Sequence, residues 1–149
     1  MFYEFLENLK LFNYLAINQK IKFLIKMPPG TEENITMLKK CFKNLNFIKS
    51  DLKKNLEKCL LTISYSSTVI EDSLHCGVPV VLFDRWNRYK HCESQTDPKI
   101  MNESIYYVTN KTDLIDSINS IKNSKKFNFD HYIYSTKSKE NIDKLFSNI

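Results

Sequence analysis

The sequence predicts an α/β domain in which helices cover both faces of a doubly wound parallel sheet. Short apolar segments alternate with longer segments of helical periodicity along the 149 residues. The apolar segments are continuous rather than alternating, which is typical of strands buried on both faces of a parallel sheet. A chain of this length, with 42% hydrophobic residues, is sufficient for one globular core, so we predict a single domain over residues 1–149.

The first third of the chain should contribute two helices and two strands. Phe5, Leu9 and Phe12 recur at helical spacing and predict an amphipathic helix over residues 2–18. The apolar segment 21–26 predicts a strand, which two prolines and a glycine end. Inward-facing apolar residues then predict a helix over 33–44, followed by a short strand over 46–50.

The remaining two thirds repeat the same alternation. Asp51 is a good N-cap for a short helix over 51–59, and the apolar segment 60–65 predicts a buried strand. The next helix should end at Gly77, because glycine readily adopts the left-handed conformation found after a helix. The other expected elements are a helix over 67–76, strands over 78–83 and 104–108, and helices over 111–123 and 138–149.

Composition limits the partners and the compartment. A net charge of +5 and a pI near 8.9 favour an anionic partner. Nucleic acid is the least favoured of the anionic partners, because residues 85–91 contain few basic residues and no recognition motif surrounds them. Four separated cysteines and the lack of a secretion signal predict a reduced, cytoplasmic protein. The two His-Cys pairs, at 75–76 and 91–92, match no zinc spacing, so we expect no metal.

Hydroxyl side chains directly follow the strand predicted over 60–65. Ser66, Ser67 and Thr68 lie where this strand turns into the next helix, at the carboxyl edge of the sheet, where ligands bind in such folds. Backbone N–H groups at the helix start, joined by hydroxyl donors, suit a phosphate or diphosphate. In the alternative interpretation, Thr68 and Glu71 form a capping box and close the helix start on each other. We expect that capping role for Glu71.

Asp72 lies one position beyond the capping-box pattern. Its carboxylate could accept two hydrogen bonds from a ribose diol, as an acid near a nucleotide phosphate site commonly does. The alternative is an acid favoured by the helix dipole on a solvated face. The segment alone does not separate the two.

A basic and aromatic loop follows the strand predicted over 78–83. Arg85 and Arg88 are interleaved with Trp86 and Tyr89, and the loop should emerge at the same carboxyl edge as Ser66. Guanidinium groups bind phosphates, and aromatic rings offer a face to a base or sugar. The alternative is a solvated basic loop that its tryptophan anchors to the core.

Residues 65–81, "YSSTVIEDSLHCGVPVV", resemble the donor-binding segment of GT-B glycosyltransferases. In that family a strand, a Ser/Gly-rich turn and a helix hold a nucleotide sugar, and an acid lies five residues before Gly-x-Pro, here Asp72. The pair Glu71-Asp72 is similar to the paired acids of UDP-N-acetylglucosamine 2-epimerases. "FLIKMPPG" is similar to the Lys-x-x-Pro loop of CDP-glycerol glycerophosphotransferase-like enzymes of capsule synthesis. Secondary site candidates are therefore Glu71, Lys26 and Gly77.

The resemblance implies a Rossmann-like GT-B half-domain that lacks its usual first strand. It implies a nucleotide sugar as donor substrate, no cofactor, and glycosyl transfer in surface or capsular polysaccharide biosynthesis once an acceptor domain completes the cleft. The catalytic base would come from that second half. Two alternatives stay open: a UDP-sugar 2-epimerase-like fragment, and a non-catalytic binding subunit that pairs with an acceptor-domain chain. We expect the chain either to pair with an acceptor-domain partner or to self-associate. We also expect peripheral contact with the inner face of the membrane.

Overall fold

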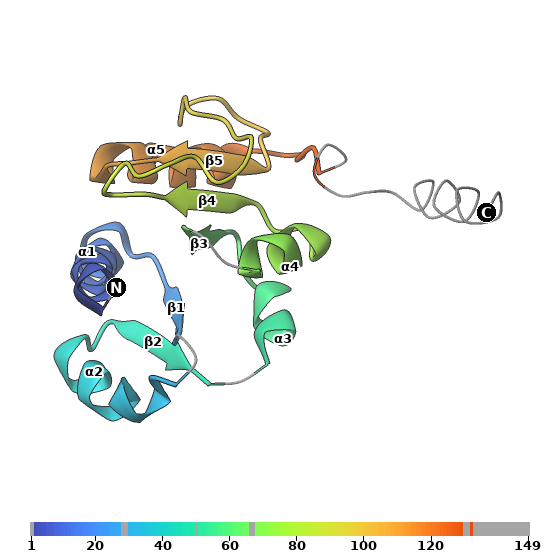
Figure 1. The fold of residues 1–149 in the computed structure, drawn as a ribbon. Coiled ribbons are helices and arrows are strands. Elements are labelled where there is room, and N and C mark those ends of the chain that lie inside the picture. The colour runs from blue at the N-terminus through green and yellow to red at the C-terminus, as the bar shows by residue number, and fades with distance from the viewer. Residues whose placement is uncertain (1, 28–29, 50, 66–67, 130–131, 133–149) are drawn as a thin grey trace, which may run out of the picture. The chain divides into compact units, whose positions relative to one another are not determined.

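The computed structural model describes residues 2–27, 30–49, 51–65, 68–129 and 132. These residues confirm the α/β class and the parallel pairing of the strands. The chain divides into two compact units, residues 1–52 and 53–149, and each unit has its own sheet (Figure 1). That residues 1–149 act as one domain stays a prediction.

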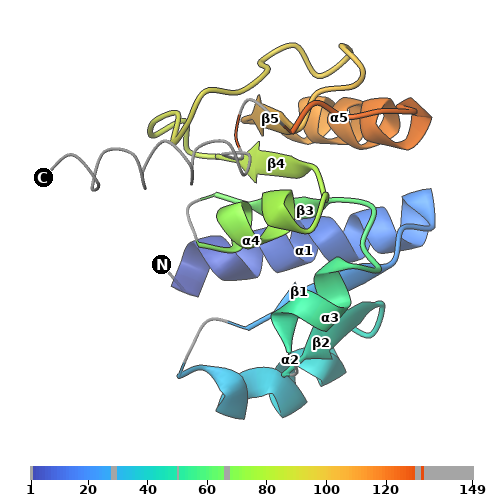
Figure 2. The ribbon, with the colours of Figure 1, turned by 90° about the vertical axis from the view of Figure 1, so that its right-hand side faces the viewer.

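The first unit is a two-stranded parallel sheet between two helices (Figures 1 and 2). Strand β1 pairs with β2 in a register that joins Phe23 to Leu45 and Lys26 to Ile48. The ring of Phe12 stacks on that of Phe23 at 5.1 Å, which attaches the first helix to the sheet. In chain order the elements are α1 (Phe2–Gln19), β1 (Phe23–Lys26), η1 (Glu32–Asn34), α2 (Ile35–Cys41) and β2 (Leu45–Ile48).

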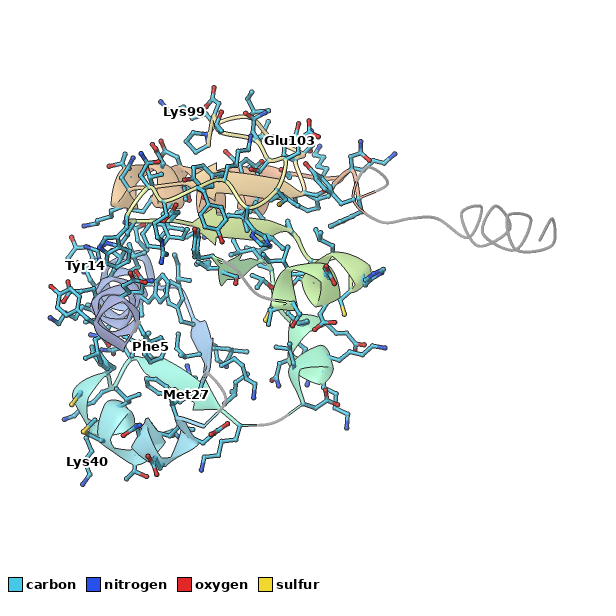
Figure 3. All side chains as sticks on the ribbon, viewed as in Figure 1. Phe5, Tyr14, Met27, Lys40, Lys99 and Glu103 are labelled. Carbon is cyan, nitrogen blue, oxygen red and sulfur yellow. The ribbon has the colours of Figure 1, made fainter. Side chains whose placement is uncertain are left out.

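Burial in the first unit follows the predicted periodicity. Leu9 and Leu15 of α1 are buried, whereas Tyr14 projects into solvent (Figure 3). In both strands every second residue is buried, as the two-residue side-chain period of a strand requires. Met27, at the end of β1, closes this core with only 2% of its surface exposed.

The second unit is a three-stranded parallel sheet in the order β3-β4-β5. The central strand β4 is buried at all four positions, so it forms the middle of the core. Helix α4 packs on β3 and β4, and α5 packs on β4 and β5. The elements are α3 (Leu52–Leu56), which begins in the first unit, β3 (Thr62–Ser64), α4 (Val69–His75), β4 (Val80–Phe83), β5 (Ile105–Val108) and α5 (Lys111–Asn123).

The described strands form two ladders, one in each unit. Each ladder begins a new run of strand, helix and parallel strand, from β1 to β2 and from β3 to β4. Periodicity predicts strands but does not specify which strands pair.

The predicted end of helix α4 is confirmed. Gly77 has a φ of +70°, in the left-handed region. Its N–H donates to the carbonyl of Leu74, and the N–H of Val78 donates to the carbonyl of Ser73, both at 2.9 Å. These two bonds are a Schellman motif, which satisfies carbonyls at the end of a helix.

Helix α5 covers residues 111–123, as predicted, and begins at an N-cap, Asn110. The side chain of Asn110 accepts a hydrogen bond from the N–H of Asp113 at 2.9 Å. The helix expected over 138–149 lies outside the described residues. Within the part of the chain that is described, no helix combines the length and apolarity needed to cross a membrane.

Candidate functional site

The end of β3 and the loop after β4 meet at the carboxyl edge of the three-stranded sheet. Tyr65 follows β3, and the guanidinium carbon of Arg88 lies 3.9 Å from the centre of its ring. The ring of Tyr89 meets that of Tyr65 edge to face, with centroids 5.6 Å apart. These contacts confirm that the basic loop emerges beside the residue that precedes Ser66.

A buried carboxylate, Asp84, organises this loop. It directly follows the four buried residues of β4 and is 0% exposed. Its Oδ2 accepts hydrogen bonds from the backbone N–H groups of Arg88 at 2.6 Å and Tyr89 at 3.2 Å. Its Oδ1 accepts one from Arg88 Nε at 3.3 Å, and the hydroxyl of Tyr107 donates to Oδ2 at 3.0 Å. A charged group is retained in a core only when it is paired and hydrogen-bonded in this way.

The tight course of the loop depends on Asn87. Its φ is +48°, in the left-handed region that asparagine enters more readily than most residues. The N–H of Asn87 donates to the carbonyl of Asp84 at 3.0 Å, which closes the turn. The chain therefore returns over the Asp84 side chain, and the next two amides point at it.

Asp84, Tyr65 and Tyr107 are not among the site residues that the sequence predicts. One signal was present: an acid immediately after an uninterrupted apolar strand must find partners, because an unpaired buried charge is costly. The sequence does not predict which residues those partners are, because Tyr107 is 23 residues from Asp84 along the chain.

Two tyrosines of this cluster, Tyr65 and Tyr107, have raised pKa values. Burial raises the pKa of Tyr107, and its hydrogen bond to the Asp84 carboxylate raises it further. Burial also raises the pKa of Tyr65. The Tyr107 hydroxyl therefore serves as a hydrogen-bond donor to Asp84, whereas the Tyr65 hydroxyl is buried without a hydrogen-bond partner among the described residues.

The capping box predicted for Thr68 and Glu71 is wrong. Thr68 has right-handed helical angles, φ −58° and ψ −17°, and its side chain makes no capping hydrogen bond. Its carbonyl accepts from the N–H of Asp72 at 3.2 Å, as the carbonyl of the residue that precedes a helix does. A capping side chain needs the extended backbone of a true N-cap residue, which Thr68 does not have.

The other predicted site residues occupy different surroundings. Ser66 and Ser67 lie outside the described residues. Asp72 and Glu71 are both exposed in the first turn of α4, where the helix dipole favours acids. Gly77 has a structural role at the other end of that helix, and Lys26 is the exposed last residue of β1 in the first unit.

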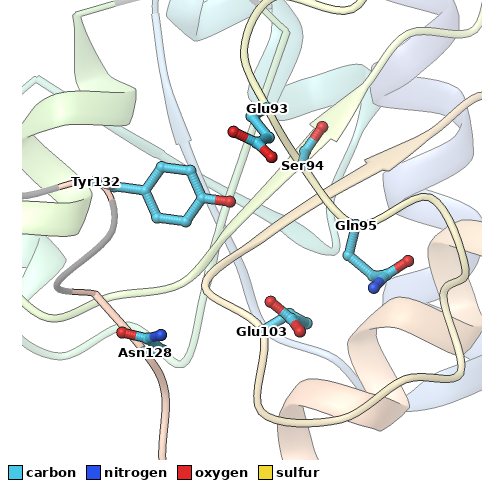
Figure 4. Close-up of a pocket in the computed structure, with 6 residues that line it drawn as sticks. All are labelled: Glu93, Ser94, Gln95, Glu103, Asn128 and Tyr132. Atoms are coloured by element: carbon cyan, nitrogen blue, oxygen red, sulfur yellow. The ribbon is translucent and has the colours of Figure 1, made fainter.

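A separate cavity of about 260 Å³ lies near the amino end of β5 (Figure 4). None of the predicted site residues that the structure describes line it. The carboxylates of Glu93 and Glu103 give it a negative character that disfavours a phosphate, and burial raises the pKa of Tyr132 at its wall. Its lining residues are Glu93, Ser94, Gln95, Glu103, Asn128 and Tyr132.

Metal ligands do not cluster in the described part of the chain. No group of three or more His, Cys, Asp or Glu side chains there is arranged to hold an ion. Comparison with known proteins finds neither a family model nor a curated protein that matches the chain.

Proposed function

We propose that this chain is the part of a glycosyltransferase that binds a nucleotide-sugar donor, for surface or capsular polysaccharide biosynthesis. The binding site is the carboxyl edge of the three-stranded sheet. Ser66, Ser67 and Thr68 bind the diphosphate, Asp72 binds the ribose, and the loop over 85–89 supplies cations and aromatic faces.

One observation supports the proposal: the basic loop is held against Tyr65, the residue that precedes Ser66 and Ser67 in the sequence. Arg88 lies over Tyr65, which immediately precedes Ser66 in the chain. In open parallel sheets ligands bind at this carboxyl edge, and two neighbouring strands here end in hydroxyl and guanidinium groups, both of which bind phosphates.

The loop also offers aromatic surface. Trp86 is 40% exposed and Tyr89 is 56% exposed, and the cations of Arg85 and Arg88 lie 5.6 Å and 5.8 Å from the Trp86 ring centre. A nucleotide presents a flat base and an anionic diphosphate, so it matches a surface that combines rings with cations.

The chemistry that such a site supplies is stabilisation of the departing nucleoside diphosphate. Fixed hydrogen-bond donors and cations aimed at the developing negative charge lower the barrier to transfer. The buried Asp84 carboxylate is fully engaged and does not act as the general base, and the resemblance assigns that base to the missing half of the enzyme. Proton removal from the acceptor is therefore assigned to an acceptor-domain partner.

Mapping a ligand by NMR tests the proposal. Titration of the uniformly labelled chain with UDP, CDP or GDP should shift the amide signals of residues 65–72 and 84–91 and leave those around the Glu93–Glu103 cavity unchanged. Lys122→Gln is the matched control, because it removes one exposed positive charge at the far end of α5. The proposal fails if no nucleotide shifts these signals, or if Lys122→Gln weakens binding as much as Arg85→Gln does.

A further inference from the structure

The two arginines of the 85–89 loop have different surroundings. Both are candidates for phosphate contact by sequence, and they are separated by only three positions. Within the described residues, Arg88 contacts Asp84 and Tyr65, whereas Arg85 contacts the ring of Trp86. Identical side chains in such different settings are suited to different tasks.

Arg88 is held on two sides. Its Nε donates to the Oδ1 of Asp84, and the face of its guanidinium covers the ring of Tyr65 at 3.9 Å. Its backbone N–H donates to the same carboxylate. The negative charge of Asp84, which is fully buried, offsets the charge of Arg88, whose side chain is 37% exposed. The planar guanidinium is thus used for stacking and for a hydrogen bond that a lysine could not reproduce.

Arg85 is exposed, and its cation lies 5.6 Å from the centre of the Trp86 ring. Among the described residues, no carboxylate lies within ion-pair distance of it. Its positive charge is therefore uncompensated locally, and that makes it the stronger attractor for an anion.

We propose that Arg85 is the anion-contacting residue of this edge and that Arg88 is a positioning residue, which fixes the loop through Asp84 and Tyr65. This inference rests on the proposed function for its ligand, a nucleoside diphosphate, while the role of Arg88 is a property of the free protein. It predicts that Arg85 binds the anion through its positive charge, and that Arg88 fixes the loop through the planar geometry of its guanidinium group.

Hydrogen exchange of the free protein tests the role of Arg88 without any ligand. The backbone amides of residues 88 and 89 donate to Asp84 and should exchange slowly in the parent. Arg88→Lys keeps the charge and loses the fork, so both amides should exchange about tenfold faster, the equivalent of one lost hydrogen bond to a charged group. Arg85→Gln is the matched variant and should leave both rates unchanged. Equal rates in Arg88→Lys and the parent would overturn the positioning role.

Calorimetry with UDP, CDP and GDP, and with inorganic diphosphate, tests the role of Arg85. Arg85→Gln should weaken the nucleotide that binds by roughly tenfold, whereas Arg85→Lys should bind within about threefold of the parent, because charge is what matters. Arg88→Lys should bind more weakly than Arg85→Lys. Parent-like binding by Arg85→Gln, or equal tolerance of lysine at both positions, would overturn the assignment. If the parent protein binds none of these probes, the proposed function fails, and the anion-binding role of Arg85 fails with it. The hydrogen-exchange rates of the amides of residues 88 and 89 still decide the role of Arg88.

Discussion

Replacement of Asp84 by alanine should destabilise the second unit strongly. The carboxylate is 0% exposed and accepts hydrogen bonds from two backbone amides, a tyrosine hydroxyl and a guanidinium. Asp84→Ala removes all of these at once. It also leaves a cavity at the end of the central strand and a guanidinium without its counter-charge.

The size of the effect follows from which donors water can reach. Hydrogen bonds to a charged group contribute about 1.5–3 kcal/mol each. Water can replace the carboxylate for the exposed residues Arg88 and Tyr89, so their bonds count only in part, and the ion pair is discounted because the Arg88 side chain is 37% exposed. We therefore expect a loss of about 2–4 kcal/mol in the free energy of unfolding, at or below the range for breaking a buried ion pair.

Urea unfolding followed by tryptophan fluorescence measures this loss. Trp86 is the only tryptophan and lies in the second unit, so its emission follows that unit. Glu57→Ala is the control, since it removes an exposed carboxylate from the same unit and should change stability by less than about 0.5 kcal/mol. A similarly small change for Asp84→Ala would refute the view that this carboxylate organises the loop.

Three further predictions concern other parts of the second unit. Burial raises the pKa of Tyr106, whose hydroxyl donates to the carbonyl of Ile100 at 2.6 Å. Folding favours the protonated tyrosine, so the contribution of Tyr106 to stability should be complete below its unfolded pKa of 10.0 and should be lost as pH rises through its higher folded pKa. In urea titrations, Tyr106→Phe should reduce this loss of stability at alkaline pH. The same variant should lower the free energy of unfolding by about 1 kcal/mol at pH 7. Gly77→Ala should lower the free energy of unfolding by about 1 kcal/mol, because alanine is strained at a φ of +70°, and an unchanged urea midpoint would contradict the Schellman assignment. Asp72→Asn should weaken nucleotide binding by about 1–3 kcal/mol in calorimetry with little change in melting temperature, and Glu71→Gln should weaken it less; the reverse order would exchange their roles.

Features set by neighbouring residues were predictable from the sequence. Helix α5 has its predicted bounds because its apolar spacing and its cap, Asn110, are both local. Gly77 was predicted to end α4 in the left-handed conformation, and it does. The class of fold followed from the alternation of strands and helices, which is also a local pattern.

Features that depend on distant residues were not predictable. One local pattern, the capping box, also failed, because its sequence pattern does not specify the backbone angles of Thr68, which are helical. The division of the strands into two ladders depends on long-range pairing that periodicity leaves open. The anchoring of the loop needs Asp84 from the end of β4 and Tyr107 from β5, and only the fold brings them to 3.0 Å.

The central claim is that the carboxyl edge of the three-stranded sheet binds a nucleoside diphosphate. The most direct measurement is the melting temperature of the chain with UDP, CDP, GDP and their sugars at millimolar concentration, with inorganic sulfate as the anion control. A ligand that binds only the folded state stabilises it by about 2.7 kcal/mol at one hundred times its dissociation constant, so at least one nucleotide should raise the melting temperature clearly above sulfate. If every nucleotide matches sulfate, or if none raises the melting temperature at all, the claim is contradicted.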